Sequence, residues 1–118
     1  KDLDLAILKM VQPVNLPVLK ISLIAPKVGD QIYTIGFHFG IPALKVASHG
    51  HVTNITGKPI NLMFFDAAIN RGASGGPVLN QDFEIIGVNQ MIYTSTGDWA
   101  GIGICNEYSE FMRFINHE

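Results

Sequence analysis

Short runs of β-branched and aromatic residues recur along this chain, and sequences rich in Gly, Pro, Asn and Asp separate them. Such runs favour strands, because branched and aromatic side chains pack well on a pleated surface. Short strands separated by frequent turns are typical of an all-β barrel or sandwich. We therefore expect strands at residues 5–11, 18–23, 31–37, 44–55, 60–65, 76–79, 84–93 and 99–105.

The two ends of the chain add a connector and a helix to this pattern. Residues 12–17 contain two prolines and predict a connector after a buried strand at residues 5–11. Residues 107–116 carry apolar side chains at helical spacing, and Asn106 can cap a helix that starts after it. The expected apolar face consists of Tyr108, Phe111, Met112 and Ile115.

Composition argues against several classes of function. The net charge is −2 with no basic block or stripe, which disfavours nucleic-acid binding. No apolar run reaches the roughly 18 residues of a membrane span, so we expect none. The single cysteine, Cys105, cannot form an internal disulfide and is expected to be a buried structural thiol. We expect no cofactor. We also expect no metal: His49 and His51 would lie on the same face of a strand and could form a pair of ligands, but no third ligand is evident.

The sequence GASGGP at residues 72–77 has the composition that a serine nucleophile needs. A serine hydroxyl is a weak nucleophile, so it must be exposed beside a base and beside donors for an oxyanion. Glycines around Ser74 allow the tight, partly left-handed turns that present it. With its flanks, DAAINR at residues 66–71 and PVLN at residues 77–80, the loop resembles the nucleophile loop of the trypsin-like serine proteases.

The resemblance extends over nearly the whole chain and favours the HtrA (DegP/DegQ-like) branch. DLAILK at residues 4–9 resembles the strand that carries the triad aspartate, and VGDQIYTIGF at residues 28–37 resembles the start of the second barrel. FEIIGVN at residues 83–89 resembles the strand after the serine loop, and GIGI at residues 101–104 precedes a terminal helix as in HtrA proteases.

The fold implied by this resemblance is an antiparallel six-stranded Greek-key barrel, the second barrel of a trypsin-like protease, with a short C-terminal helix. Residues 1–17 would hold the aspartate strand and the connector between barrels. Residues 18–118 would form the C-terminal barrel with its closing helix.

The resemblance also assigns catalytic roles. Ser74 would be the nucleophile, and Asp4 would be the carboxylate that orients a histidine. The backbone N–H groups of Gly72 and Ser74 would form the oxyanion hole. Ala73 departs from the pattern, because HtrA proteases usually have asparagine there and trypsins have aspartate. Alanine cannot brace the loop with a side-chain hydrogen bond, which leaves open whether the hole is formed at rest.

Substrate contacts follow from the same resemblance. Ala68 and Ile69 would line the floor of the primary pocket, where the absence of an acid favours small to medium apolar side chains over Arg or Lys. Asn89, Gln90 and Met91 would form an edge strand that pairs with the substrate backbone. The alternative is an ordinary barrel strand with one exposed edge.

The catalytic histidine of the family lies upstream of the aspartate, and the chain has no room for it before Asp4. We therefore expect the second half of a protease domain, nearly inactive alone, that needs a missing N-terminal barrel or associates with itself. The expected function is that of a serine endopeptidase acting on polypeptide by acyl transfer; the alternative is a catalytically inactive trypsin-fold module that binds peptides. By analogy with HtrA proteases, the location would be periplasmic or otherwise extracytoplasmic.

Overall fold

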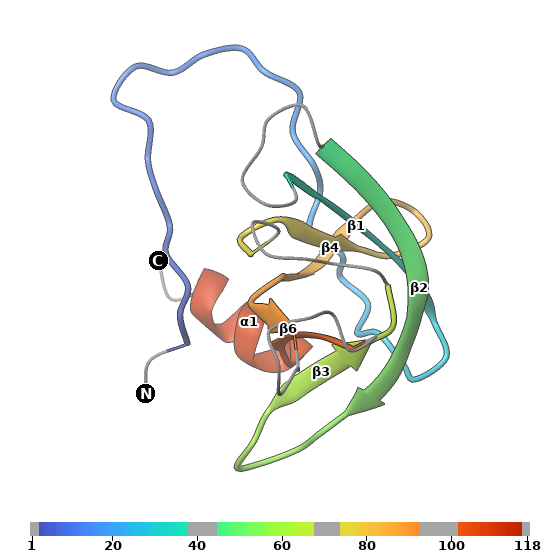
Figure 1. The fold of residues 1–118 in the computed structure, drawn as a ribbon. Coiled ribbons are helices and arrows are strands. Elements are labelled where there is room, and N and C mark those ends of the chain that lie inside the picture. The colour runs from blue at the N-terminus through green and yellow to red at the C-terminus, as the bar shows by residue number, and fades with distance from the viewer. Residues whose placement is uncertain (1–2, 38–44, 68–73, 93–101, 117–118) are drawn as a thin grey trace.

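Seven strands and one helix make up the described parts of the computed structural model, which are residues 3–37, 45–67, 74–92 and 102–116. All paired strands are antiparallel, and their order across the sheet is β5-β4-β1-β2-β3-β7-β6. The sheet curls, with the long strand β2 along one side of the molecule and α1 on the opposite side (Figure 1). The elements are β1 (Gln31–Phe37), β2 (Lys45–Ile55), β3 (Leu62–Phe65), β4 (Pro77–Leu79), β5 (Ile85–Val88), β6 (Met91–Ile92), β7 (Gly103–Asn106) and α1 (Tyr108–Asn116).

Strands β1 and β2 form the frame of the sheet. Along β1, Ile32 and Thr34 are buried whereas Ile35 is exposed, which is the alternation of a strand with one face on the core. β2 bends along its length (Figure 1), and its register to β3 shifts between Val52 and Asn54. Because such a shift increases the local bend and twist, one long strand can pair with β1 at its start and with β3 at its end.

One apolar cluster fills the inside of the curled sheet. Burial of this surface is the main force that stabilises the fold. From α1, Phe111 is 3% exposed, and Tyr108 packs against the cluster while its hydroxyl donates a hydrogen bond to the Ser22 carbonyl at 2.6 Å. The cluster consists of Ile32, Val52, Met63, Phe65, Ala67, Val78, Ile86 and Cys105.

The expected fold class is confirmed, since the chain is an all-β, antiparallel, curled sheet with a short C-terminal helix. The described part has seven strands rather than six, because the run expected as one strand at residues 84–93 contains both β5 and β6. The interruption falls at Asn89 and Gln90. Their backbone groups form hydrogen bonds to residues 74–76 and to β7, and the pairing of β5 with β4 does not continue through them.

The strand expected at residues 5–11 is wrong. Residues 3–24 instead form an extended arm whose middle part loops away from the sheet (Figure 1). Leu8 and Val11 are 92% and 98% exposed, so the arm presents apolar side chains to solvent. A strand needs a neighbour for its backbone N–H and C=O groups, and no described segment pairs with residues 5–11.

Two expectations near the ends also change. The strand expected at residues 18–23 is reduced to a single parallel bridge between Ile21 and Ile85. Asn106 does not cap the helix, because it is the last residue of β7 and its side-chain amide donates to the Leu3 carbonyl at 2.9 Å. Pairing of β7 with β3 therefore continues up to Asn106 and delays the start of the helix.

Cys105 is the buried thiol that the sequence predicts. It is fully buried in β7, and burial raises the pKa of its thiol from 9.0 to about 12. Packing is tight there, since a Cβ built on Gly87 would lie 3.0 Å from the Cys105 sulfur. The thiol thus acts as an apolar core group, and no thiolate is available at neutral pH.

This burial predicts a loss of stability in alkaline solution. Between pH 9 and about pH 12 the unfolded chain loses the Cys105 proton while the folded chain keeps it. The free energy of unfolding should therefore fall by up to about 1.4 kcal/mol per pH unit in that window. Urea unfolding under reducing conditions at pH 8 and pH 10.5 measures the fall, and Cys105→Ala supplies the control for other titrating groups. Equal pH dependence in both proteins would contradict the prediction.

Candidate active site

Ser74 lies in a tight turn that leads into β4. Gly75 follows it with φ of +92°, a left-handed conformation that glycine adopts without steric cost. Ser74 is exposed, and its Oγ donates a hydrogen bond to the backbone carbonyl of Gln90 at 2.8 Å. The turn thus presents a hydroxyl at the surface, where a nucleophile has to be.

Backbone hydrogen bonds fix this serine turn to the link between β5 and β6. The Gly75 N–H donates to the Asn89 carbonyl at 2.7 Å, and the Asn89 N–H donates to the Gly76 carbonyl at 2.8 Å. On the other side of the link, the Gln90 N–H donates to the Ile104 carbonyl of β7 at 3.0 Å. The position of the serine turn is therefore set by the sheet.

The expected substrate edge, Asn89, Gln90 and Met91, lies only partly on the edge of the sheet. Asn89 is 2% exposed, and its backbone N–H and C=O are both bonded to the serine turn, so they are not free to pair with a substrate. Its side-chain oxygen and nitrogen are buried without a hydrogen-bond partner in the described part of the chain. Met91 begins β6, the last strand of the sheet order, which pairs with β7.

Asp4 lies near the start of the extended arm, next to a residue that the sheet holds. The preceding carbonyl, that of Leu3, accepts hydrogen bonds from Gln90 Nε2 at 2.7 Å and from Asn106 Nδ2 at 2.9 Å. Asp4 itself is exposed and has φ of +57°, a left-handed conformation that aspartate tolerates better than most residues. Gln90 thus contacts both Ser74 and the residue before Asp4.

Sequence patterns do not predict the hydrogen bonds from Gln90 and Asn106 to the Leu3 carbonyl. Gln90 was expected at the site only as a substrate contact, and Asn106 only as a helix cap. Leu3 carries no motif, and its role comes from a backbone carbonyl, which every residue has. Ala68, Ile69 and Gly72, which the resemblance places at the site, lie outside the described residues.

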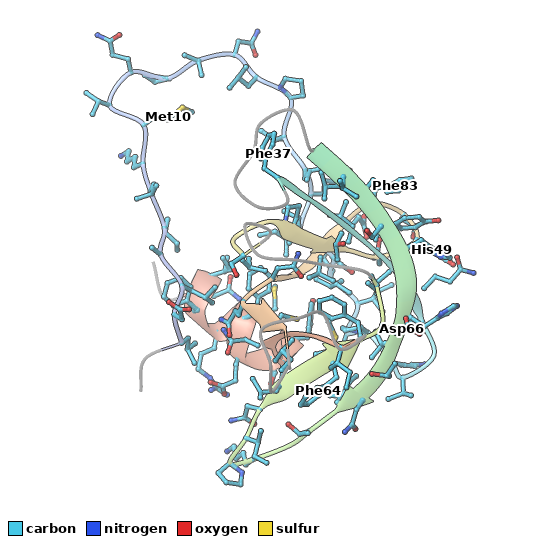
Figure 2. The ribbon with its side chains drawn as sticks, viewed as in Figure 1. Met10, Phe37, His49, Phe64, Asp66 and Phe83 are labelled. Carbon is cyan, nitrogen blue, oxygen red and sulfur yellow. The ribbon has the colours of Figure 1, made fainter. Side chains whose placement is uncertain are left out.

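His49 and His51 lie on one face of β2, as their alternation predicts, with ring centroids 5.6 Å apart. Figure 2 shows His49 on the outer side of the sheet. Asp66 accepts a hydrogen bond from the His51 N–H at 2.5 Å, and its Oδ1 lies 3.9 Å from His51 Nδ1. In the described ranges no three His, Cys, Asp or Glu side chains are grouped to hold a metal ion.

The described residues contain no helix with the length and apolar character that a membrane crossing requires.

Along the chain, the arm that contains Asp4 comes first, the turn that contains Ser74 follows, and the sheet edge at β6 comes after it. The family model of the trypsin-like peptidase domain matches residues 1–88. The chain belongs to the trypsin-like peptidase family. The resemblance stated from the sequence is therefore confirmed, and the proteins to which this trypsin-like chain is similar include DegP-like endoproteases.

Two curated relatives illustrate the match. A "Probable periplasmic serine endoprotease DegP-like" of Hahella chejuensis is 37% identical over 106 residues, which cover 84% of this chain and 22% of the relative. The "Magnetosome formation protease MamE" of Paramagnetospirillum magneticum is 34% identical over 125 aligned residues, which cover 98% of this chain and 17% of the relative. The trypsin-like chain therefore spans 17% to 22% of the length of these two relatives.

Solved structures agree on the fold. The serine endoprotease from Yersinia pestis matches with a TM-score of 0.71 and 27% identity, covering 87% of this chain and 36% of that one. The HtrA-type protease AlgW, solved with a tripeptide, matches with a TM-score of 0.76 and 23% identity, covering 90% of this chain and 37% of that one.

Proposed function

We propose that this chain is the serine-bearing part of an HtrA-like serine endopeptidase that cleaves extended polypeptide by acyl transfer. The observation that carries the proposal is the exposed Ser74 hydroxyl, held on a glycine turn and joined through Gln90 to the segment that contains Asp4. Membership of the trypsin-like peptidase family and endoprotease relatives support it.

The chemistry assigns one role to each group. Ser74 Oγ attacks the scissile carbonyl and forms an acyl-enzyme, and a histidine from a companion barrel takes the hydroxyl proton and passes it to the leaving amine. Asp4 orients that histidine and stabilises its charged form. The N–H groups of Gly72 and Ser74 stabilise the oxyanion, and water then releases the acyl group.

Substrate binding is assigned to the sheet edge near the serine turn. An extended peptide adds to an exposed strand through backbone hydrogen bonds, and β6 at the end of the sheet offers such a strand at Met91. Ala68 and Ile69 remain the proposed floor of a pocket for small to medium apolar side chains. HtrA-type relatives solved with a tripeptide and with a decapeptide support a peptide substrate.

The apolar arm supports the need for a companion. Beyond Leu8 and Val11, Val18 and Leu23 are 86% and 88% exposed, so the arm presents a series of large apolar side chains to solvent (Figure 2). Exposed apolar surface of this extent marks an interaction site. A companion barrel or a second copy of the chain would cover it.

A catalytically inactive peptide-binding module is the second candidate, and one contact favours it. The Ser74 hydroxyl donates to the Gln90 carbonyl, an acceptor that cannot remove its proton as a base does. For catalysis the hydroxyl must turn from this carbonyl to a histidine. An inactive module would keep the carbonyl contact and still bind peptide along β6.

Hydrolysis of unfolded casein separates the two candidates. The assay uses this chain together with the companion barrel that supplies the histidine, and this combination is called the intact protein below. The endopeptidase should cleave casein, lose this activity after treatment with a fluorophosphonate, and retain it in a metal chelator, because the nucleophile is a serine and not a metal-bound water. Cleavage lost only in the chelator would contradict the serine mechanism. Casein binding without cleavage would establish the inactive module instead.

A further inference from the structure

The extended arm is attached to the sheet at both of its ends. At its far end, the Ser22 N–H donates to the Ile85 carbonyl at 2.9 Å and the Ile85 N–H donates to the Lys20 carbonyl at 2.8 Å. Between the two ends, residues 5–19 make no hydrogen bond within the described part of the chain. The path of the arm beside the active site therefore depends on its near end, at Leu3 and Asp4.

Two side-chain amides hold that near end. Gln90 comes from the link between β5 and β6, and Asn106 ends β7, so the donors belong to different parts of the sheet. Their nitrogens lie 2.7 and 2.9 Å from the Leu3 carbonyl oxygen, which is ordinary hydrogen-bond geometry. A carbonyl oxygen has two lone pairs, and both are used here.

Gln90 is itself firmly placed. Its N–H donates to the Ile104 carbonyl of β7, and its carbonyl accepts from Ser74 Oγ. Asn106 is 8% exposed and pairs with Leu62 of β3 through the strand ladder. Because their backbones are fixed, the side chains of Gln90 and Asn106 can hold the Leu3 carbonyl in one position. That carbonyl belongs to the peptide bond that joins Leu3 to Asp4.

We propose that Gln90 and Asn106 form a clamp on the Leu3 carbonyl that positions Asp4 relative to Ser74. Gln90 is then a positioning residue with two contacts, since its backbone meets the nucleophile and its side chain fixes the backbone next to the carboxylate. This inference rests on the proposed function for its catalytic consequence. The clamp itself is a structural claim that can be measured without activity.

A carbonyl resonance reads the clamp directly. Leu3-Asp4 is the one Leu-Asp pair in the sequence, so labelling with carbonyl-¹³C leucine and ¹⁵N aspartate isolates the Leu3 carbonyl in a correlated spectrum of the chain. Gln90→Glu keeps the side-chain shape but replaces the donor with a carboxylate, and Asn106→Ala removes the other donor. In each variant the Leu3 resonance should move toward its position in the urea-unfolded chain.

The matched control is Gln81→Glu, which makes the same chemical change at an exposed turn position. It should leave the Leu3 resonance in place. Unchanged Leu3 resonances in both Gln90→Glu and Asn106→Ala, with the rest of the spectrum showing a folded chain, would overturn the clamp.

The catalytic consequence is read in the intact protein from the rate of fluorophosphonate labelling. Gln90→Glu should lower the maximal labelling rate about tenfold, the effect of losing one typical hydrogen bond to a positioned group, and leave the half-saturating concentration unchanged. Gln81→Glu should change neither. A general folding defect would instead reduce the fraction of protein that can be labelled.

The failures of the two claims are distinguishable. A moved Leu3 resonance with an unchanged labelling rate would overturn the positioning role and leave the proposed function standing. Absence of labelling at Ser74 in the unchanged protein would sink the proposed function, and the positioning role with it, whatever the resonance shows.

Discussion

Replacing Ser74 with alanine should lower the rate of casein hydrolysis by the intact protein by a factor on the order of 10⁶. The reason is that, in the proposed mechanism, Ser74 Oγ forms the bond to the acyl group that water later hydrolyses, and alanine has no oxygen to form it. Stability should change by less than about 0.5 kcal/mol, because the side chain is exposed and its loss opens no cavity in the core. Initial rates and urea unfolding curves, measured on the same preparations, give both quantities.

Ser109→Ala is the matched control for this substitution. Ser109 is also exposed, and its Oγ bonds to Glu107 at the start of α1, away from the serine turn. Its removal should leave the rate of hydrolysis unchanged. Full activity in Ser74→Ala would show that another residue is the nucleophile, and equal losses in both variants would point to a folding defect.

Replacing Gly50 with alanine should destabilise the fold by about 3 kcal/mol, at the upper end of the cost of overpacking a core. Gly50 is buried in β2, and a Cβ there would lie 2.5 Å from the Ala67 nitrogen, 2.8 Å from the Ala67 Cα, and in contact with Asp66 Oδ1. Two of these atoms are backbone and cannot move aside as a flexible side chain can. The midpoint of urea unfolding, at unchanged slope, measures the loss.

The same change at Gly57 provides the comparison. A Cβ on Gly57 meets nothing within 4 Å, so Gly57→Ala should leave the unfolding midpoint nearly unchanged. Equal midpoints for the two variants would contradict the close approach of β2 to Asp66 and Ala67.

The sheet could be predicted because its strands carry local patterns. The run at residues 31–37 coincides with β1, and the turn at residues 80–82 joins β4 to β5 as its Asn and Asp residues predict. The arm could not be predicted in the same way. Its apolar residues suit a buried strand, but a strand also needs a partner, and partners are a property of the fold and not of the segment.

The chemistry of the site was partly readable for the same reason. Ser74 lies in a motif whose glycines indicate a turn with left-handed backbone conformations, and Gly75 has the positive φ that such a turn needs. The contacts to Leu3 could not be predicted from the sequence, because Gln90 and Asn106 are separated from Leu3 by 87 and 103 positions along the chain. Nothing local distinguishes such amides from those of exposed residues.

The site of covalent attachment of a fluorophosphonate to the intact protein is the most direct test of Ser74 as the nucleophile. After labelling and digestion, peptide mapping should find the adduct on Ser74, in the peptide that contains GASGGP, and Ser74→Ala should abolish it. An adduct on any other residue of this chain would contradict the account.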